Sequence, residues 1–243
     1  MRGGDDVTVN EKAVVLLSGG LDSATLLHYV RQTVGVEVLY TCAFSYGQKH
    51  CRELECAAWQ SRAVGAARHT VLPLDALGTV CGDASALTGA DVDVPSLSDL
   101  SEEQRRQPPT YVPNRNMIFL SLAAAFAESH GVADVYYGAQ AQDEYGYWDC
   151  TAGFVERINA VLSLNRRTPV RIHAPFVGMS KAEVLAMGLA LGVDYARTWS
   201  CYRGDSHACG VCPTCVERLA AFREQGLVDP LEYAAQQKRD ETL

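Results

Sequence analysis

The sequence predicts an α/β protein with a doubly wound, parallel sheet of five strands and a small cysteine-rich appendage. Short apolar runs alternate with segments of helical periodicity, an order that predicts parallel strands joined by helical crossovers. Such crossovers are right-handed and cover both faces of the sheet. Four of the nine cysteines lie close together near the C-terminus. We therefore expect an α/β domain at 1–198 and a helical appendage at 199–243 that packs on it.

The first half of the chain supplies three of the expected strands. Residues 13–17, AVVLL, are a buried strand that runs into the turn Ser18-Gly19-Gly20. The segment DSATLLHYVRQT then places Ala24, Leu27 and Val30 at helical spacing. The other expected elements of this half are a strand at 36–44, a helix at 51–66 and a strand at 69–74.

The second half continues the alternation after a long polar connection at 82–110. A connection of this length is typical of a functional lid or a mobile loop. Residues 116–131 predict an apolar helix ended by a glycine. Ser180 and Glu183 form a capping-box pattern, which predicts a helix that opens there and runs to residue 192. The other expected elements are a strand at 133–140, a helix at 154–164 and a strand at 170–176.

Composition excludes several classes of protein. Of the 243 residues, 48% are apolar and 21% charged, and the net charge is −8. This acidic balance argues against nucleic acid as a partner, because phosphate contacts favour a basic surface. No run approaches the roughly 18–20 apolar residues of a membrane span, and the start MRGGDDVTVN lacks a signal-peptide core. We expect a cytoplasmic protein without a membrane partner, whose cysteines stay reduced.

Residues 16–25, LLSGGLDSAT, carry the strongest functional signal. Two glycines let the backbone turn tightly, and the free N–H groups of the following helix make an anion site. Ser18 and Ser23 add hydroxyl donors. Asp22 suits a phosphate site when Mg²⁺ lies between them, because Mg²⁺ binds carboxylates together with phosphates. A plain glycine turn with an Asp or Ser cap is the alternative interpretation.

The loop differs from the GxxxxGK[ST] and GxGxxG patterns. It resembles the pyrophosphate loop of the N-type ATP pyrophosphatases, which cleave ATP between the α and β phosphates and activate a substrate oxygen as its adenylate. The resemblance implies an adenine nucleotide alpha hydrolase-like, Rossmann-like fold that uses ATP and Mg²⁺. It places catalytic roles on Ser18, Asp22, Ser23 and Lys181. The implied nucleotide-binding residues are Leu17, Ser18, Gly19, Gly20, Leu21, Asp22, Ser23, Ala24, Thr25, Arg115 and Lys181.

Two of these basic residues lie far from the loop in sequence. Lys181 stands at a helix start, where a cation is unfavourable unless an anion binds there. Arg115 lies between Asn114 and Asn116, before an apolar helix, a setting in which arginine often meets phosphate or carboxylate. A solvated lysine and a surface salt bridge are the respective alternatives.

Three further stretches narrow the resemblance. They are VPNRNMIFLS at 112–121, DEYGYWDC at 143–150, and TWSCY at 198–202 ahead of the cysteine run. With SGGLDS they resemble the 7-cyano-7-deazaguanine synthase family of queuosine-precursor biosynthesis, in the family's order from about residue 13 to 233. The resemblance implies that ATP adenylates 7-carboxy-7-deazaguanine and that ammonia displaces AMP to form the amide. A second ATP then activates the amide oxygen, and loss of AMP leaves the nitrile.

The segment 143–150 also supplies the expected substrate-binding residues. Asp149 can accept both N–H groups of a guanine-like edge, and Tyr145, Tyr147 and Trp148 can stack on the ring. An aromatic core corner is the alternative for each aromatic residue. The family pattern is close to GYPDCRPEF, whereas this chain reads GYWDCTAGF at 146–154. A related deazapurine substrate, or a reaction that stops at the amide, therefore stays open.

The cysteine run predicts a closed metal site. Cys201, Cys209, Cys212 and Cys215 form the pattern C-x7-C-x2-C-x2-C, and four thiolates complete a tetrahedral structural Zn²⁺ site. An iron–sulfur cluster is the alternative, since four cysteines also ligate it. The family resemblance implies one structural zinc per chain at these positions.

Two other functions compete with this interpretation. A tRNA-thiolating ATP pyrophosphatase would use a CxxC pair to relay sulfur, but the acidic balance and the fourth cysteine argue against it. A zinc-ribbon interaction module on a nucleotide-sensing domain would bind ATP without turnover, and Asp22 argues against that. No cysteine follows Met1 to serve as a glutaminase nucleophile, so we expect free ammonia as the nitrogen source. The resemblance also implies a homodimer.

Overall fold

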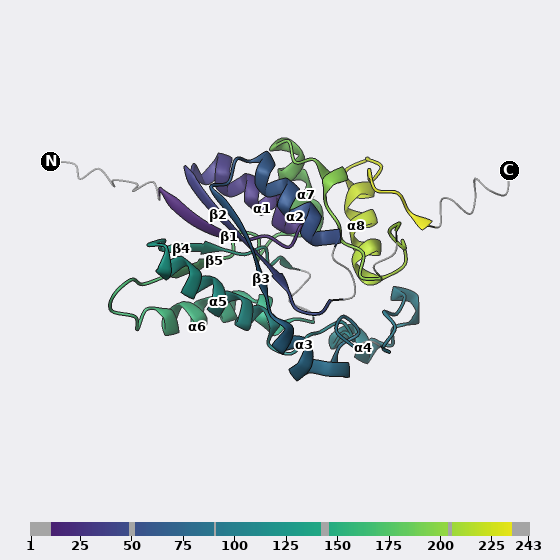
Figure 1. Ribbon diagram of the computed structural model, residues 1–243. Coiled ribbons are helices and arrows are strands. Elements are labelled where there is room, and N and C mark those ends of the chain that lie inside the picture. Colours follow the sequence, from purple (N-terminus) through teal and green to yellow (C-terminus); the bar gives the residue numbers. More distant parts are fainter. Residues whose placement is uncertain (1–10, 49–51, 90, 142–145, 204–205, 235–243) are drawn as a thin grey trace.

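The computed structural model describes residues 11–48, 52–89, 91–141, 146–203 and 206–234. Five parallel strands form one sheet in the order β3-β2-β1-β4-β5 (Figure 1), which confirms the predicted doubly wound topology. The strands are β1 (Lys12–Leu16), β2 (Val38–Ser45), β3 (Arg68–Pro73), β4 (Asp134–Tyr136) and β5 (Arg171–His173).

Helices cover both faces of this sheet (Figure 1). One face carries α1 (Leu21–Tyr29), α2 (Arg52–Ala63) and α7 (Lys181–Ala190), and the other carries α5 (Arg115–Ser129) and α6 (Ala152–Leu162). The central strand β1 shows why its sequence is apolar throughout. Ala13 and Val15 belong to the core on one face, Val14 belongs to the core on the other, and all three are fully buried. Burial of each valine contributes about 1.5–3 kcal/mol.

Several predicted elements end earlier than the sequence pattern suggests. The strand predicted at 133–140 is paired only over β4, and the chain beyond Tyr136 leaves the ladder to line a cavity. The helix predicted at 22–33 is α-helical to Tyr29 and continues as a π-helical turn, Val30–Val34, which ends at Gly35 with φ +81°. Glycine suits that left-handed position.

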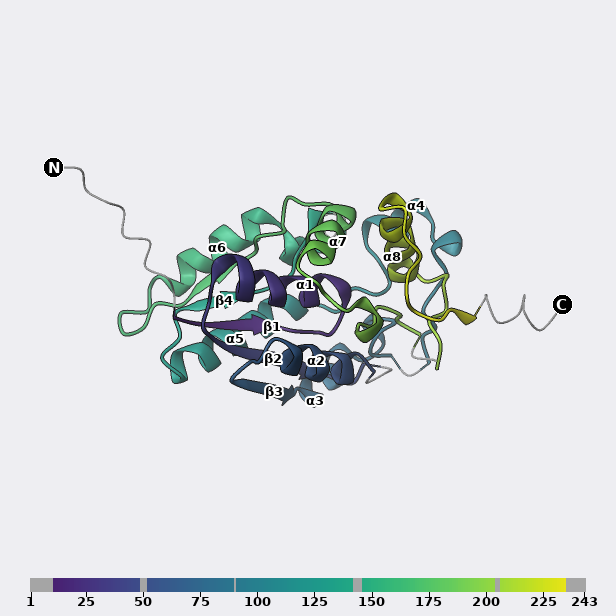
Figure 2. The same ribbon diagram turned by 90° about the horizontal axis from the view of Figure 1, so that it is seen from above.

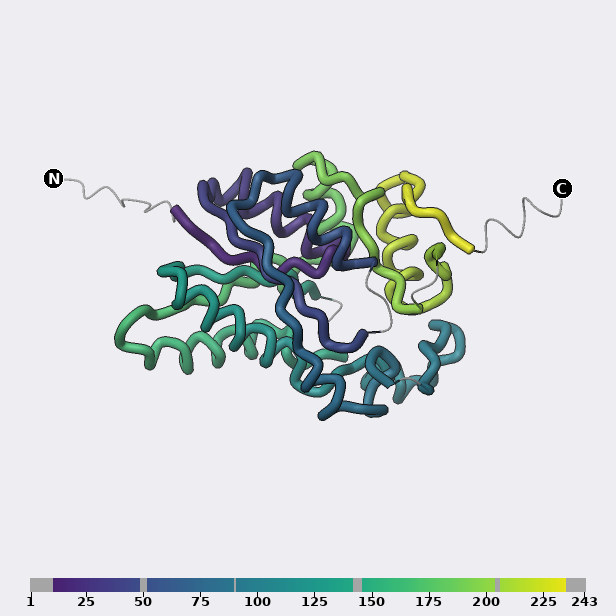
Figure 3. Tube along the Cα trace, viewed as in Figure 1, coloured from purple at the N-terminus to yellow at the C-terminus, as the bar shows by residue number. Residues whose placement is uncertain are grey.

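The described part of the long connection between β3 and α5 is folded and packs against the rest of the protein, and several of its residues line the cavity. The lid or mobile loop expected here stays a prediction. It contains α3 (Asp75–Cys81) and α4 (Glu102–Arg106), and Ala86 and Leu87 join a core that also holds Trp199. Leu97 N donates to Val211 O at 2.9 Å. Figures 2 and 3 show this segment at the same end of the sheet as the C-terminal segment.

The C-terminal segment contains α8 (Pro213–Glu224), which packs against α7. Proline at the first position of α8 is preorganised for a helix start. The domain boundary at residue 198 stays a prediction. Within the part of the chain that the structure describes, no helix combines the length and the apolar character that a membrane crossing requires.

Candidate active site

A cavity of about 510 Å³ opens at the carboxyl ends of the strands. Its walls include Leu17–Ser18 after β1, Tyr46 after β2 and Tyr137–Ala139 after β4. The order β3-β2-β1-β4-β5 changes direction between β1 and β4. Ligands of doubly wound folds bind in the crevice at such a switch point, so the fold itself places a binding site here.

The loop after β1 forms a compact hydroxyl cluster at one end of the cavity. Ser18 Oγ and Ser23 Oγ lie 3.0 Å apart, Gly20 N donates to Ser18 Oγ at 3.3 Å, and Gly19 N donates to Ser23 Oγ at 3.2 Å. Helix α1 begins at Leu21, one residue earlier than expected, and no side chain among the described residues caps its N-terminus. The positive end of the helix dipole is therefore available to an anion.

Gly19 is required by the close approach of α2. Its φ is +87°, and a Cβ at this position would lie 2.0 Å from the carbonyl oxygen of Glu53. Any side chain would displace the first turn of α2. Trp199 N donates to Gly19 O at 2.9 Å, which joins the loop to the C-terminal segment.

Asp22 and Lys181 meet at the cavity wall. Lys181 is the first residue of α7, is buried, and lies 3.6 Å from Asp22 Oδ2 and 3.0 Å from Glu217 Oε2. Burial raises the pKa of Asp22, and the Lys181 ammonium opposes that rise. Asp22 Oδ1 is buried without a hydrogen-bond partner among the described residues. An unpartnered carboxylate oxygen of this kind fits a hard cation such as Mg²⁺.

Arg115 reaches the cavity from the start of α5. Its Nη1 donates to Tyr46 Oη at 3.4 Å, and its guanidinium lies 6.0 Å from the centroid of that ring. The preceding residue, Asn114, has φ +57°, a left-handed conformation that costs a non-glycine residue energy. This turn directs the arginine toward the cavity.

Of the three predicted base-binding residues that the structure describes, one lines the cavity and two do not. Tyr147 lines the cavity and shares a hydrogen bond with Thr110 Oγ1 at 2.8 Å. Asp149 does not line it: its two carboxylate oxygens accept from Asn116 N at 3.0 Å and Asn116 Nδ2 at 3.3 Å. Trp148 also lies off the cavity wall, and its indole donates to Tyr111 Oη. Tyr145 lies outside the described residues.

The four clustered cysteines converge as the spacing predicts. The sulfur atoms of Cys201, Cys209, Cys212 and Cys215 all lie within 4.8 Å of one another, and all four residues are buried. Cys209 Sγ and Cys215 Sγ lie 4.0 Å apart. A tetrahedral zinc site with Zn–S bonds of about 2.3 Å needs S···S distances of about 3.8 Å. The backbone N–H groups of Cys209 and Cys212 donate to cluster sulfurs at 3.3 Å each, which suits thiolate acceptors.

Comparison with known proteins agrees with these motifs. A family model described as "Queuosine biosynthesis protein QueC" matches residues 12–226. The chain belongs to the QueC family.

The curated relatives of this QueC family chain include 7-cyano-7-deazaguanine synthases. One from Chromohalobacter salexigens is 48% identical over 223 residues, 92% of this chain and 86% of that protein. Another from Marinobacter nauticus is 45% identical over 225 residues, 93% of this chain and 98% of that protein. A solved NMN synthetase structure from Francisella tularensis has a TM-score of 0.47 at 14% identity and covers 90% of this chain and 79% of that one.

The departures from the expected family pattern at 146–154 lie away from the cavity. From this stretch only Gly146, Tyr147 and Cys150 line it, and all three match the pattern. Thr151, which stands where the pattern has arginine, caps α6 by accepting from Phe154 N at 3.1 Å. The changed positions therefore lie beside the cavity, around the start of α6, and the three residues of this stretch that line the cavity match the expected pattern.

The predicted nucleotide-binding residues at 17–25 do not all line the cavity. Leu17, Ser18, Gly20, Leu21, Asp22 and Ser23 line the cavity, whereas Gly19, Ala24 and Thr25 support it from behind. Two acidic lining residues, Glu53 and Glu217, were not predicted from the sequence. Each lies in a helix with other charged residues, so only the contacts in the folded protein distinguish it.

Proposed function

We propose that this chain is an ATP-dependent enzyme that converts 7-carboxy-7-deazaguanine and ammonia to 7-cyano-7-deazaguanine through adenylated acid and amide intermediates. The observation that supports this most directly is the cavity at the switch point. Its lining includes the serine-glycine loop and Asp22, whose Oδ1 has no hydrogen-bond partner among the described residues. The names of the relatives give the same reaction class.

The residues of the loop would hold the pyrophosphate that leaves. Ser18 and Ser23 offer hydroxyls, and the start of α1 offers N–H groups. Asp22 would hold Mg²⁺, which neutralises phosphate charge when bound. Helix-end electrostatics contributes only about 0.3–1 kcal/mol, so the buried ammonium of Lys181 is a further source of positive charge. Arg115 would face a phosphate or the substrate carboxylate.

Of the aromatic residues predicted to stack on the deazapurine ring, Tyr147 lines the cavity, and in this proposal it stacks on the ring. Asp149 acts indirectly in this proposal. Its carboxylate holds the first turn of α5 through Asn116, and that turn carries Arg115. Asp149 is 1% exposed and does not line the cavity, so a direct contact with the base would require a rearrangement that exposes its carboxylate. Asp149 is therefore proposed as a positioning residue.

One structural zinc per chain would occupy the four-cysteine cluster. We expect Cys209→Ser to remove this metal and to lower the thermal stability, because a closed zinc site contributes directly to folding free energy. Metal analysis and thermal unfolding of the purified variant measure both effects. Cys56→Ser is the matched control, since Cys56 is half-buried and lies outside the cluster. A Cys209→Ser variant that keeps a full zinc complement would contradict the assignment.

The deciding assay is incubation with 7-carboxy-7-deazaguanine, ammonia and MgATP, followed by mass spectrometry. The nitrile together with AMP is the expected result. The amide alone would show that the second activation is absent, and the absence of any product would contradict the proposal. The proposal retains free ammonia as the nitrogen source, a cytoplasmic location and a homodimer, the last of which size-exclusion chromatography with light scattering measures.

A further inference from the structure

Glu53 is a cavity-lining carboxylate that the proposed function has not yet used. It lies in the first turn of α2, and its backbone carbonyl packs against Gly19 of the loop Ser18–Gly20 after β1, called the phosphate loop below. A substrate activated on that loop is therefore close to the start of α2. The side chain is half-buried, and no cation within the described residues lies within ion-pair distance of it.

One oxygen of this carboxylate is fixed by a preorganised amide. Gln48 Nε2 donates to Glu53 Oε1 at 3.1 Å and also to Phe44 O at 3.1 Å. Gln48 Oε1 in turn accepts from Tyr46 N at 2.7 Å. The amide is therefore held by the backbone at the end of β2, so its orientation is set before any ligand binds. Within the described part of the chain, Glu53 Oε2 makes no hydrogen bond.

The surroundings favour a proton on this group near neutral pH. Burial raises the pKa of Glu53 to about 7, against opposing contributions from the Gln48 amide and the Arg115 guanidinium. Arg115 faces it from α5 and Tyr46 faces it from the end of β2. The other charged residues that line the cavity are Asp22, Arg105, Lys181 and Glu217. A general base is most effective when its pKa lies near the working pH.

The geometry points to Glu53 as the general base that removes the amide N–H protons when the nitrile forms. In that step, which depends on the proposed function, the amide carbonyl oxygen attacks the α-phosphorus of ATP and pyrophosphate leaves. Glu53 Oε2 accepts a proton from the activated nitrogen and passes it to solvent. It then accepts the second proton, whose bond pair forms the third carbon–nitrogen bond while the carbon–oxygen bond breaks and AMP departs. No oxidant or reductant is needed.

The test uses the full chain and the amide of the substrate, 7-amido-7-deazaguanine, with MgATP, so that ammonia does not enter the measurement. For the wild-type enzyme, kcat for nitrile formation should rise with pH through about 7 and then level, because the base acts in its deprotonated form. Glu53→Gln should lower kcat by about 100-fold or more and abolish that rise, while KM for the amide stays unchanged. Glu55→Gln, an exposed change on the same helix, is the control and should behave as wild type.

A second readout separates this role from a failure to fold or to bind. ATP–pyrophosphate exchange with the carboxylic acid substrate needs no N–H proton to be removed, so Glu53→Gln should retain it. If Glu53→Gln keeps both the pH rise and the rate of nitrile formation, the role of Glu53 is overturned, while the proposed function of the enzyme stands. A variant that loses exchange, or that raises KM at unchanged kcat, would make Glu53 a structural or binding residue instead. A wild-type enzyme that forms no nitrile would overturn the proposed function, and this inference with it.

Discussion

The Asp22→Asn variant should lose about 100- to 1,000-fold of its ATP–pyrophosphate exchange rate, the range observed when one preorganised electrostatic contact is removed from an active site. Asp22 lines the cavity, and its Oδ1 is buried without a partner among the described residues. An amide in its place keeps the shape of the side chain but removes the negative charge that a bound Mg²⁺ requires. The leaving pyrophosphate would then lack its principal counter-charge.

Stability distinguishes this prediction from a simple folding defect. Burial raises the pKa of Asp22, so the charged form is already unfavourable in the folded protein. Asp22→Asn should therefore unfold at no lower temperature than the wild type, and Lys181 keeps its contact with Glu217. Asp91→Asn, the same chemical change at an exposed position, is the control and should leave exchange unchanged. An Asp22→Asn enzyme with wild-type exchange would show that this carboxylate holds no catalytic metal.

The parts of the site that could be predicted from sequence are those in which a local pattern determines the geometry. The strand–SGGLDS–helix order defines the loop, since glycines and a helix start are read within a few residues. The cysteine spacing is similarly local, and the predicted family resemblance is confirmed by the family model. The five-stranded sheet could be predicted because apolar runs alternate with helical segments over the whole domain, and the structure confirms it.

The parts that could not be predicted depend on contacts between distant segments. Asp149 has the right chemistry for a base edge, but it is buried off the cavity wall, where its oxygens accept hydrogen bonds from Asn116 of α5. Glu217 becomes significant only because α8 packs beside the start of α7. The connection after β3 is polar in sequence, yet a few apolar residues such as Leu87 and Val94 anchor it to the core around Trp199. Tertiary partners therefore decide which of several plausible side chains reach the cavity.

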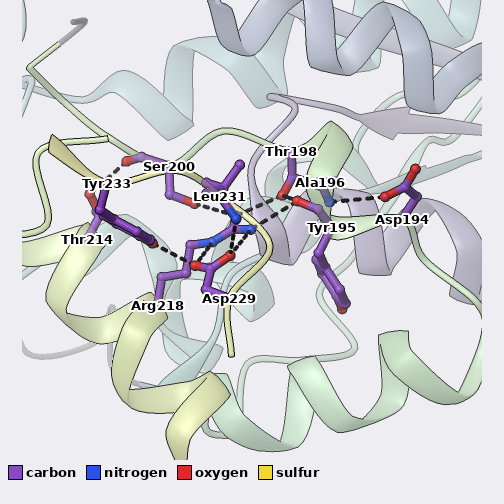
Figure 4. A network of polar contacts seen from close by, with 10 residues as sticks. All are labelled: Asp194, Tyr195, Ala196, Thr198, Ser200, Thr214, Arg218, Asp229, Leu231 and Tyr233. Atoms are coloured by element: carbon purple, nitrogen blue, oxygen red, sulfur yellow. Dashed lines mark hydrogen bonds and ion pairs between the residues drawn. The ribbon is translucent and has the colours of Figure 1, made fainter. Parts of the chain in front are cut away.

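The largest expected loss of stability comes from the buried pair Arg218–Asp229. Figure 4 shows Arg218 at the centre of a polar network in the C-terminal segment. Its Nε and Nη2 donate to the two oxygens of Asp229 at 2.6 and 3.0 Å. Nη1 donates to Thr198 Oγ1 at 2.7 Å and Nη2 to Tyr195 O at 3.0 Å, and the arginine side chain is 1% exposed. This arginine therefore ties α8 to the segment that leads from α7.

Arg218→Met should lower the free energy of unfolding by about 3–5 kcal/mol, because it leaves the buried carboxylate of Asp229 without its counter-charge. Urea denaturation of the purified protein measures this loss, and Arg223→Met, an exposed change on the same helix, should cost little. The double variant Arg218→Met/Asp229→Asn should be more stable than Arg218→Met alone, since no unpaired buried charge remains. If both variants lose the same amount, the arginine acts mainly through its bonds to Thr198 and Tyr195. Tyr195 Oη also shares a hydrogen bond with Thr25 Oγ1 of α1 at 2.7 Å. In either case the loss of stability should therefore extend to α1, the helix that follows the phosphate loop.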